Sequence, residues 1–360
     1  MITIKTADLK EFFKRTSFIK TNSILPILSY IEIRSEGDSA IITKTNQHVF
    51  CQHQVEIESD KNETILVEQD KLTALLDSNK ADTITITSNG KKVELYDGTI
   101  RSAHGVIKDG QHFPKFPTAA ADSTRAHLPF EFIEALQLAK HLVTSESELR
   151  TSFIFVKKQK HGCDVFSTNN FILYVRAFKE SLPDMCLVPE VCGVLNQAKE
   201  WDHYSNERFD FFDCGRTVFA FIKSEHVPVN YTIVTARFSS EKSFTVERQR
   251  IFNYVDYVCK IAPAAKNALD LVECQFSVKG NNLVMRFEEQ TLNESADSQV
   301  PIEGNFGEES GSFNAKMMLQ VLKTVPYEKV TFSRVDGAGC WFVSTENDPD
   351  YIGSIQKLNV

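Results

Sequence analysis

Apolar and polar positions follow one pattern that occurs three times along the chain. Each copy opens with a helix whose apolar residues recur at i, i+3, i+4 and i+7, predicted over residues 7–19, 128–143 and 247–262. Apolar, β-branched segments follow, and a second amphipathic helix begins near Val67, Val188 and Phe313. Each copy closes with strands around a tight turn, such as Asn89-Gly90 in the first. The pattern predicts three α+β units of roughly 120 residues each.

Short polar stretches separate the three units. AAADSTRA (119–126) and SSEKS (239–243) consist of small and polar residues, as interdomain segments commonly do. We therefore expect domains at 1–123, 124–243 and 244–360. One phrase also occurs twice: an apolar run enters a Thr-Asn pair in IITKTNQHVF (41–50) and again in DVFSTNNFILYV (164–175). The inward-facing residues expected on the six helices are Leu9, Phe12, Phe13, Thr16, Leu72, Leu75, Leu76, Phe132, Ala135, Leu136, Ala139, Val188, Val191, Val194, Leu195, Ile251, Tyr254, Val255, Val258, Met317, Met318, Val321 and Leu322.

Composition and charge narrow the class of protein. The 360 residues are 42% hydrophobic and carry a net charge of −8, which argues against a surface coated in nucleic acid but leaves room for a basic strip. The N-terminus lacks a signal-peptide layout, and no apolar run reaches about 18 residues, so a soluble, cytoplasmic protein is expected. The eight cysteines form no CxxC pair, which indicates reduced and mostly buried thiols.

Motifs that carry catalysis or bind cofactors do not occur in the sequence. It contains no Walker loop, no GxGxxG and no HExxH. His48 and His53 stand beside no carboxylate cluster, so we expect surface histidines and no metal site. An enzyme would need a set of residues assembled across domains. We therefore expect a protein without catalytic activity and without a cofactor.

Four stretches resemble one known family. They are LPILSYIEI (25–33), FPKFP (113–117), STNN (167–170) and FNAKMMLQVLKTV followed by YEKVTFS (313–333), and they occur in the family's order over the whole chain. The chain thus resembles the bacterial DNA sliding clamp, the β subunit of DNA polymerase III. The resemblance implies an α+β fold of three repeated clamp domains, each with two helices lining a pore and antiparallel sheets outside. Two subunits would join head to tail in a ring that encircles duplex DNA and tethers a polymerase, which raises its effective concentration at the primer end.

The resemblance implies a DNA-facing set on the polar faces of the helices and in two loops. Phosphate contacts of this kind carry no sequence information and weaken with salt, which suits sliding. The alternative is that these cations belong to ordinary solvated faces. The set is Lys10, Lys14, Lys20, Lys71, Lys140, Arg150, Lys199, Arg248, Arg250, Lys260, Lys316 and Lys323.

The resemblance also implies a pocket for short peptides of the polymerase and the clamp loader. The positions are Thr168, Asn170, Phe171, Ile172, Leu173, Pro228, Val234, Met317, Ser354, Ile355 and Gln356. The family pattern T-D-G/A-H-[RK]-L is T-N-N-F-I-L here, and the apolar tail M-P-[MV]-[RM]-L is S-I-Q-K-L. Phe171 and Ile172 could instead simply fill a strand. The changes suggest a divergent or mobile-element copy with its own polymerase.

The implied dimer contact differs from the family pattern as well. Ser102 and His104 replace an apolar pair and would face Ile261 and Ala262. Charge could compensate, because the first unit carries Lys71, Arg101 and Lys108 on this edge. The matching acidic run is Glu288, Glu289, Glu294, Asp297, Glu303, Glu308 and Glu309, for which the alternative is a solvated loop. The rival function for the whole chain is a clamp-fold scaffold that binds peptides but no longer encircles DNA.

Overall fold

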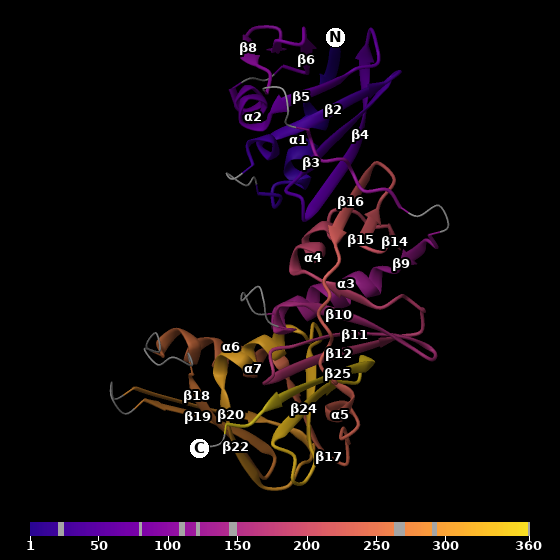
Figure 1. Cartoon of the computed structure of the whole chain (residues 1–360). Helices are drawn as coiled ribbons and strands as arrows, with labels where there is room; N and C mark the ends of the chain where they lie inside the picture. Colours follow the sequence, from indigo (N-terminus) through magenta and orange to yellow (C-terminus); the bar gives the residue numbers. More distant parts are fainter. Residues whose placement is uncertain are drawn as a thin grey trace. The chain divides into compact units, whose positions relative to one another are not determined.

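The computed structural model describes residues 1–20, 25–78, 81–107, 112–119, 123–143, 150–262, 271–289 and 294–358 (Figure 1). The chain is a mixed α/β protein built mostly of antiparallel strands. It divides into two compact units: the N-terminal unit (Met1–Phe130 and Gly193–Lys223) and the C-terminal unit (Glu131–Cys192 and Ser224–Val360). The predicted domain limits near 123 and 243 stay predictions.

The same order of elements occurs three times, as the sequence pattern predicts. The first repeat contains β1 (Ile2–Lys5), α1 (Thr6–Arg15), η1 (Pro26–Ser29), β2 (Tyr30–Glu36), β3 (Ser39–Thr45), β4 (Val49–Ser59), β5 (Thr64–Glu68), α2 (Gln69–Ser78), β6 (Thr83–Ser88), β7 (Lys92–Tyr96) and β8 (Arg101–Gly105). The second contains β9 (Ala126–Leu128), α3 (Phe130–Ala139), η2 (Lys140–Leu142), η3 (Arg150–Ser152), β10 (Ile154–Gln159), β11 (Gly162–Thr168), β12 (Ile172–Phe178), β13 (Met185–Leu187), α4 (Pro189–Leu195), β14 (Trp201–Ser205), β15 (Phe209–Asp213) and β16 (Thr217–Ile222). After the short α5 (Thr232–Thr235), the third contains β17 (Lys242–Glu247), α6 (Arg248–Ile261), β18 (Glu273–Lys279), β19 (Asn282–Glu289), β20 (Glu294–Pro301), β21 (Glu303–Asn305), β22 (Glu309–Asn314), α7 (Ala315–Lys323), β23 (Lys329–Arg334), β24 (Cys340–Thr345) and β25 (Asp348–Gln356).

Strand pairing joins consecutive repeats in one recurring way. The fourth strand of the first repeat, β4, pairs antiparallel with β16, the last strand of the second. The fourth strand of the second repeat, β12, pairs in the same way with β25, the last strand of the third. In the described chain, β8 pairs only with β7 and β20 only with β19. One last strand and one fourth strand are therefore left as sheet edges.

The phrase that occurs twice in the sequence is one hairpin turn used twice. In the first copy, the Thr45 hydroxyl accepts the N–H of Gln47 (2.8 Å), and the Asn46 side chain accepts the N–H of Val49 (2.9 Å). The second copy repeats these bonds at Thr168 and Asn169. The third residue of each turn, Gln47 or Asn170, has φ +74°. Thr and Asn side chains thus bind the backbone groups that the reversal leaves unpaired.

The helices bury the faces that their periodicity predicts. Leu9, Phe12 and Thr16 of the α1 segment are buried, while Lys10 and Lys14 are exposed. The other helices follow the same rule, except that Val188 and Met317 are half-buried; Phe13 on α1 is half-buried too. In the C-terminal unit, α6 and α7 lie side by side on one side of the strands (Figure 1). None of the eight cysteines, all of which lie in the described residues, forms a disulfide, and four of them are buried.

His53 corrects the expectation of a surface histidine. Only 1% of it is exposed, because β4 is covered on one edge by β16, more than 160 residues away in sequence. Its Nδ1 lies 2.8 Å from the Thr217 hydroxyl, and its Nε2 has no hydrogen-bond partner among the described residues. Burial lowers the pKa of His53.

Stability of the N-terminal unit should therefore fall as the pH drops below the ordinary histidine pKa of about 6.5. The unfolded chain then binds a proton at His53 that the folded chain rejects, so folding loses at most about 1.4 kcal/mol per pH unit. Chemical unfolding of wild type and His53→Asn at pH 7.5 and 5.5 tests this. The asparagine variant should show a smaller loss between the two pH values; equal losses would contradict the prediction.

Candidate functional site

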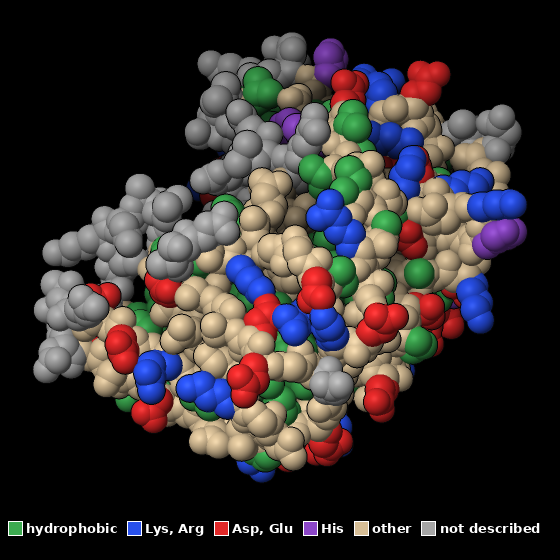
Figure 2. Space-filling model, turned by 90° about the horizontal axis from the view of Figure 1, so that it is seen from below, with side chains coloured by type: hydrophobic (Ala, Val, Ile, Leu, Met, Phe, Trp, Pro, Cys, Tyr) green, Lys and Arg blue, Asp and Glu red, His purple; other side chains and the backbone are tan. Residues whose placement is uncertain are grey.

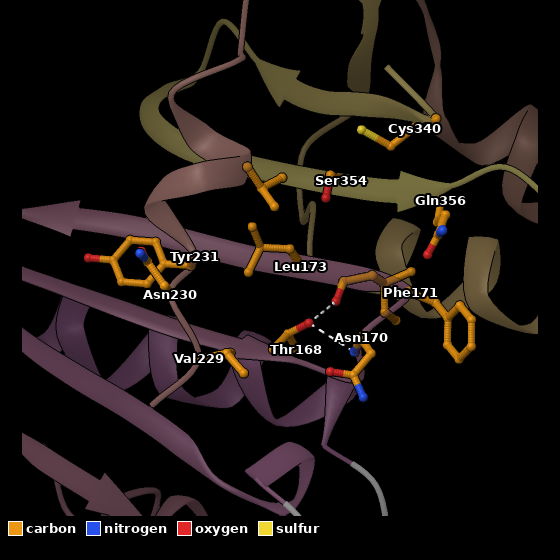
Figure 3. Close-up of a pocket in the computed structure, with 13 residues that line it drawn as sticks. Thr168, Asn170, Phe171, Leu173, Val229, Asn230, Tyr231, Cys340, Ser354 and Gln356 are labelled. Carbon is orange, nitrogen blue, oxygen red and sulfur yellow. Dashed lines mark hydrogen bonds between the residues drawn. The ribbon is translucent and has the colours of Figure 1, made fainter. Parts of the chain in front are cut away.

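An apolar cavity of about 320 Å³ lies in the C-terminal unit (Figure 3). Its walls come from the β11–β12 turn, from the segment that leads into α5, and from β24 and β25. The lining residues are Thr168, Asn170, Phe171, Ile172, Leu173, Val229, Asn230, Tyr231, Val234, Gly339, Cys340, Ser354 and Gln356. None of these side chains carries a fixed charge, so shape and apolar contact dominate its chemistry.

The structure brings most of the predicted pocket residues together. Three of them do not line the cavity and are corrections. Ile355 is fully buried, because alternation along β25 places Ser354 and Gln356 on the opposite face. Pro228 lines a neighbouring cavity instead, and Met317 is half-buried on α7. Ile172 is buried within β12, as strand packing requires, whereas 48% of Phe171 is exposed.

Five lining residues were not expected from the sequence: Val229, Asn230, Tyr231, Gly339 and Cys340. Tyr231 is the most constrained of them. Its ring packs on Phe166 with centroids 4.1 Å apart, and its hydroxyl donates to Asp164 at 2.5 Å and accepts from Gln159 at 2.7 Å. Burial, aided by Asp164, raises the pKa of Tyr231, so the phenol stays neutral. Tyr231 thus forms a fixed wall of the cavity.

The C-terminal segment forms the opposite wall and is held in place. The N–H of Gln356 donates to the carbonyl of Phe171 at 2.8 Å, which ties β25 to the β11–β12 turn. Beyond it, the N–H of Lys357 donates to Gly339, also at 2.8 Å. The Lys357 ammonium and the Arg334 guanidinium both pair with the carboxylate of Glu309. The cavity is therefore preformed, which lowers the entropic penalty of binding a peptide.

Phe171→Ala should weaken binding of an apolar peptide about tenfold or more, because peptide affinity concentrates in a few apolar anchors. Figure 3 shows the Phe171 ring at the rim, directed away from the other lining side chains, where an incoming chain can cover it. Fluorescence titration with a short apolar peptide derived from a bacterial replicative polymerase measures the effect. Phe130→Ala is the matched control, since Phe130 is 57% exposed and outside the cavity. Equal affinities for the two variants would contradict the prediction.

The cations predicted to face DNA fall into three groups. Lys10, Lys14, Lys20, Lys71, Lys140 and Lys323 are exposed, and no ion pair to them is found in the described chain. Arg250 and Lys260 are exposed but paired with Glu247 and Asp256, both at 2.6 Å. Arg248 is half-buried over the ring of Phe252, and burial lowers its pKa. Lys316 is half-buried.

Two positions depart from the expected helix faces. Lys199 is exposed but lies beyond the end of α4 at Leu195, because the helix stops four residues earlier. Arg150 begins η3, and its side chain lies outside the described atoms. Cations from two repeats lie near one another in the C-terminal unit. Burial lowers the pKa of His141, and the positive charges of Lys323 and Lys140 lower it further. Figure 2 shows basic and acidic side chains interspersed over the face in view, with no broad patch of one sign.

Of the predicted dimer residues, Arg101, Ser102 and His104 lie on the edge strand β8. Ser102 and His104 are half-buried on β8 and hydrogen-bond to each other at 3.0 Å. Arg101 is exposed and lies 3.8 Å from Glu94, and Lys71 is exposed on α2. Ile261 and Ala262, at the end of α6, are half-buried. Lys108 lies outside the described residues.

Four residues of the acidic run fall into two pairs with different surroundings. Glu309 is bound by Arg334 and Lys357, and Glu303 lies 3.5 Å from Lys329, so both serve the third repeat itself. Glu294 and Asp297 lie on the edge strand β20, with Asp297 exposed. These two remain available to face a second chain.

Within the described residues, no group of three His, Cys, Asp or Glu side chains could hold a metal ion. The helices of the described chain are also all too short or too polar to cross a bilayer.

Comparison with known proteins places the fold. A family model described as "DNA polymerase III beta subunit, N-terminal domain" matches residues 1–114. A search of curated proteins finds no match. Among solved structures, Caulobacter crescentus pol III beta is 16% identical with a TM-score of 0.86, and the DNA polymerase III subunit beta of Pseudomonas aeruginosa is 16% identical with a TM-score of 0.87. The Thermotoga maritima beta subunit is 14% identical with a TM-score of 0.84, and all three comparisons cover 100% of both chains. Residues 1–114 thus match the N-terminal domain of the DNA polymerase III beta subunit, and the chain as a whole has the fold of these bacterial sliding clamps, as its sequence predicts.

Proposed function

We propose that this chain is a DNA sliding clamp: a non-catalytic, head-to-tail homodimer that encircles duplex DNA and tethers the replicative polymerase. The proposal rests on two strands, β8 and β20, each of which has one edge without a partner strand in the described chain. Each joint inside the chain consists of one fourth strand and one last strand, and β20 and β8 are the two left over. A second copy supplies both missing partners, and two such contacts close a ring of six repeats.

The exposed lysines of the helices support a DNA-facing inner surface. Lys10 and Lys14 lie one turn apart on α1 and project from the same side. The net charge of −8 disfavours nonspecific coating of DNA, while a ring with local cations inside can slide along phosphates. We expect such a clamp to act in the cytoplasm and to need no cofactor.

Retention on DNA tests the proposal. Loaded wild-type protein should stay on nicked circular DNA during gel filtration and should leave after the circle is cut, because a linear end releases a ring. Loss from the intact circle at the same rate as from the linear form would overturn the proposal.

Lys10→Ser with Lys14→Ser should reduce the salt dependence of this binding without unfolding the chain. Exposed cations contribute little to stability, and each phosphate contact that is lost lowers the log–log salt slope by about 0.9. The matched control is Lys160→Ser with Lys179→Ser, which removes two exposed lysines that lie outside the helices. The prediction is wrong if the two double variants have the same slope.

The cavity supports the tethering part of the proposal. It is apolar, preformed and of a size that takes two or three side chains of a peptide. Binding there leaves the helices free, so DNA and a polymerase peptide can be held together. The effective concentration of the polymerase at the primer end then rises without any catalytic group.

A peptide-binding scaffold that does not encircle DNA is the second candidate. One observation favours it: the β4–β16 pairing inside the chain is packed with aromatic side chains, whereas the free edge of β8 is more polar. In the β4–β16 joint, Phe18 packs against Phe219 and Phe221, with ring centroids 5.9 and 6.3 Å apart. The equivalent positions on β8 are Ser102 and His104, which bury less apolar surface. A protein that binds peptide through the cavity but is never retained on circular DNA would be this scaffold.

A further inference from the structure

A second cavity, in the N-terminal unit, contains a buried cation. Its volume is about 380 Å³, and it is lined by residues of the α1 end, β3 and α2. The polar lining residues are Ser17, Lys20, Lys44, Gln69 and Thr73, and none of the lining residues is acidic. The cavity therefore has a positive lining beside two of the helices whose exposed lysines are proposed to face DNA.

Lys44 is unusual among the lysines because only 2% of it is exposed. Its Nζ donates to the carbonyl of Thr16 at 3.1 Å, at the C-terminal end of α1, where the helix dipole favours a cation. This carbonyl is the one acceptor that the described chain offers an ammonium with three donors. Burial lowers the pKa of Lys44 to about 8, although the nearby Cys51 and Asp70 act in the other direction. A buried charge without a hydrogen-bonded counter-ion is unfavourable, so an anion in the cavity would stabilise it.

Two further polar atoms at the cavity lack partners. Thr73 Oγ1 and Gln69 Oε1 are buried, and neither forms a hydrogen bond within the described residues. The Thr73 hydroxyl can donate to an anion. Gln69 opens α2, a helix of ten residues; its Oε1 is an acceptor, so toward an anion this residue offers only its N–H groups. Donors from three elements thus surround a space that holds no acidic side chain.

We propose that this cavity is an anion site that takes a phosphate group, with Lys44 Nζ and Thr73 Oγ1 as its donors. The source of the phosphate is the backbone of the DNA that the proposed clamp function brings to α1 and α2, so this part rests on that function. Lys20 at the rim, together with Lys10 and Lys14 on α1, provides the exposed charge that leads a phosphodiester to the buried ammonium. This contact would add one phosphate to those that the protein binds on DNA, and it would carry no information about the base sequence.

The test compares Lys44→Met with wild type and with Lys160→Met. Methionine keeps the stem of the side chain and removes the buried charge, so Lys44→Met should fold, as circular dichroism will check. Lys160 is an exposed lysine of the C-terminal unit and serves as the matched control. Thermal unfolding is followed as inorganic phosphate replaces chloride at constant ionic strength. Phosphate should raise the Tm of wild type and Lys160→Met by an equal amount, and that of Lys44→Met by clearly less.

The second arm measures DNA binding as a function of salt. Lys44→Met should lower the log–log slope by about 0.9, the value for one phosphate, and Lys160→Met should leave it unchanged. An equal phosphate-induced rise in Tm for wild type and Lys44→Met overturns the anion site. A normal slope for Lys44→Met overturns the DNA backbone as the source, and a smaller Tm rise would then assign the site to free phosphate. If wild type itself does not bind DNA, the clamp proposal fails, and the phosphate arm alone decides the site.

Discussion

A chain that carries Ser102→Cys together with Ser295→Cys should form a covalent dimer under mild oxidation, and neither single variant should. The register comes from the joints inside the chain. The β7–β8 and β15–β16 hairpins have turns of equal length, so Ser102 is equivalent to Phe219. The β3–β4 and β19–β20 hairpins also match, so Ser295 is equivalent to Cys51.

Phe219 and Cys51 face each other across the β4–β16 joint. Ser102 should therefore face Ser295 of a second chain. Directly opposed residues of antiparallel strands have Cα atoms about 4.5–5.5 Å apart, which is within the range of a disulfide.

The matched control pairs Ser102→Cys with Ser298→Cys, three residues further along β20. That cysteine would lie about 10 Å from its partner, too far for a disulfide. Denaturing electrophoresis without reductant reads both results. Equal yields of covalent dimer from the two double variants would mean that the strands do not pair in this register.

The variant with Ser102→Cys and Ser295→Cys also distinguishes charge from apolar packing as the interaction that holds the dimer together. Ser102 and His104 leave little apolar contact, so Arg101 and Lys71 against Glu294 and Asp297 should carry much of the dimerisation. Such exposed pairs are screened over about 8 Å at physiological salt. The wild-type dimer should then dissociate between about 50 and 500 mM salt in sedimentation experiments, while the oxidised double cysteine variant stays dimeric. A wild-type dimer equally tight at both salt concentrations would show that packing closes the ring.

Local patterns in the sequence predict the repeats well, because each helix face and each hairpin depends on residues close to one another. The inward faces of α1 and α6 follow from spacing alone, and the Thr45-Asn46 turn follows from side chains that bind their own backbone. The resemblance adds the order of the repeats and most of the pocket. These features need no knowledge of distant contacts.

Features that depend on distant strands could not be predicted in this way. His53 is buried because β16 covers its strand, and no local pattern reports that pairing. Tyr231 and Cys340 reach the cavity from an irregular segment and from the start of β24, where periodicity gives no signal. The resemblance implies that Ile355 is a pocket residue, but the alternation of side chains along β25 turns it inward. No local pattern indicates the burial of Lys44, because lysine side chains are normally exposed.

Arg176→Met should destabilise the C-terminal unit by about 3 kcal/mol, because it leaves a buried carboxylate without its partner. Arg176 Nε lies 2.9 Å from Asp348 Oδ2, and the two side chains are only 15% and 9% exposed. The pair lies at the β12–β25 joint, where Arg176 takes the position that His53 has in the other joint. Urea unfolding at pH 8 measures the loss. Arg176→Met with Asp348→Leu should recover most of it, since an apolar pair of similar volume replaces a buried ion pair at little cost.

The pH dependence distinguishes an orphaned charge from a simple packing defect. Burial raises the pKa of Asp348, and Arg176 opposes that shift, so removing Arg176 should raise the pKa further. A carboxyl group whose folded pKa lies above its unfolded value binds a proton more tightly when folded, which adds stability at low pH that is lost as the pH rises through the folded pKa. The defect of Arg176→Met should therefore be smaller at pH 5 than at pH 8, while the double variant should differ from wild type equally at both. A defect of the single variant that is the same at the two pH values would mean that Arg176 acts through packing on Phe178, whose ring lies 5.3 Å from its guanidinium, and not through its charge.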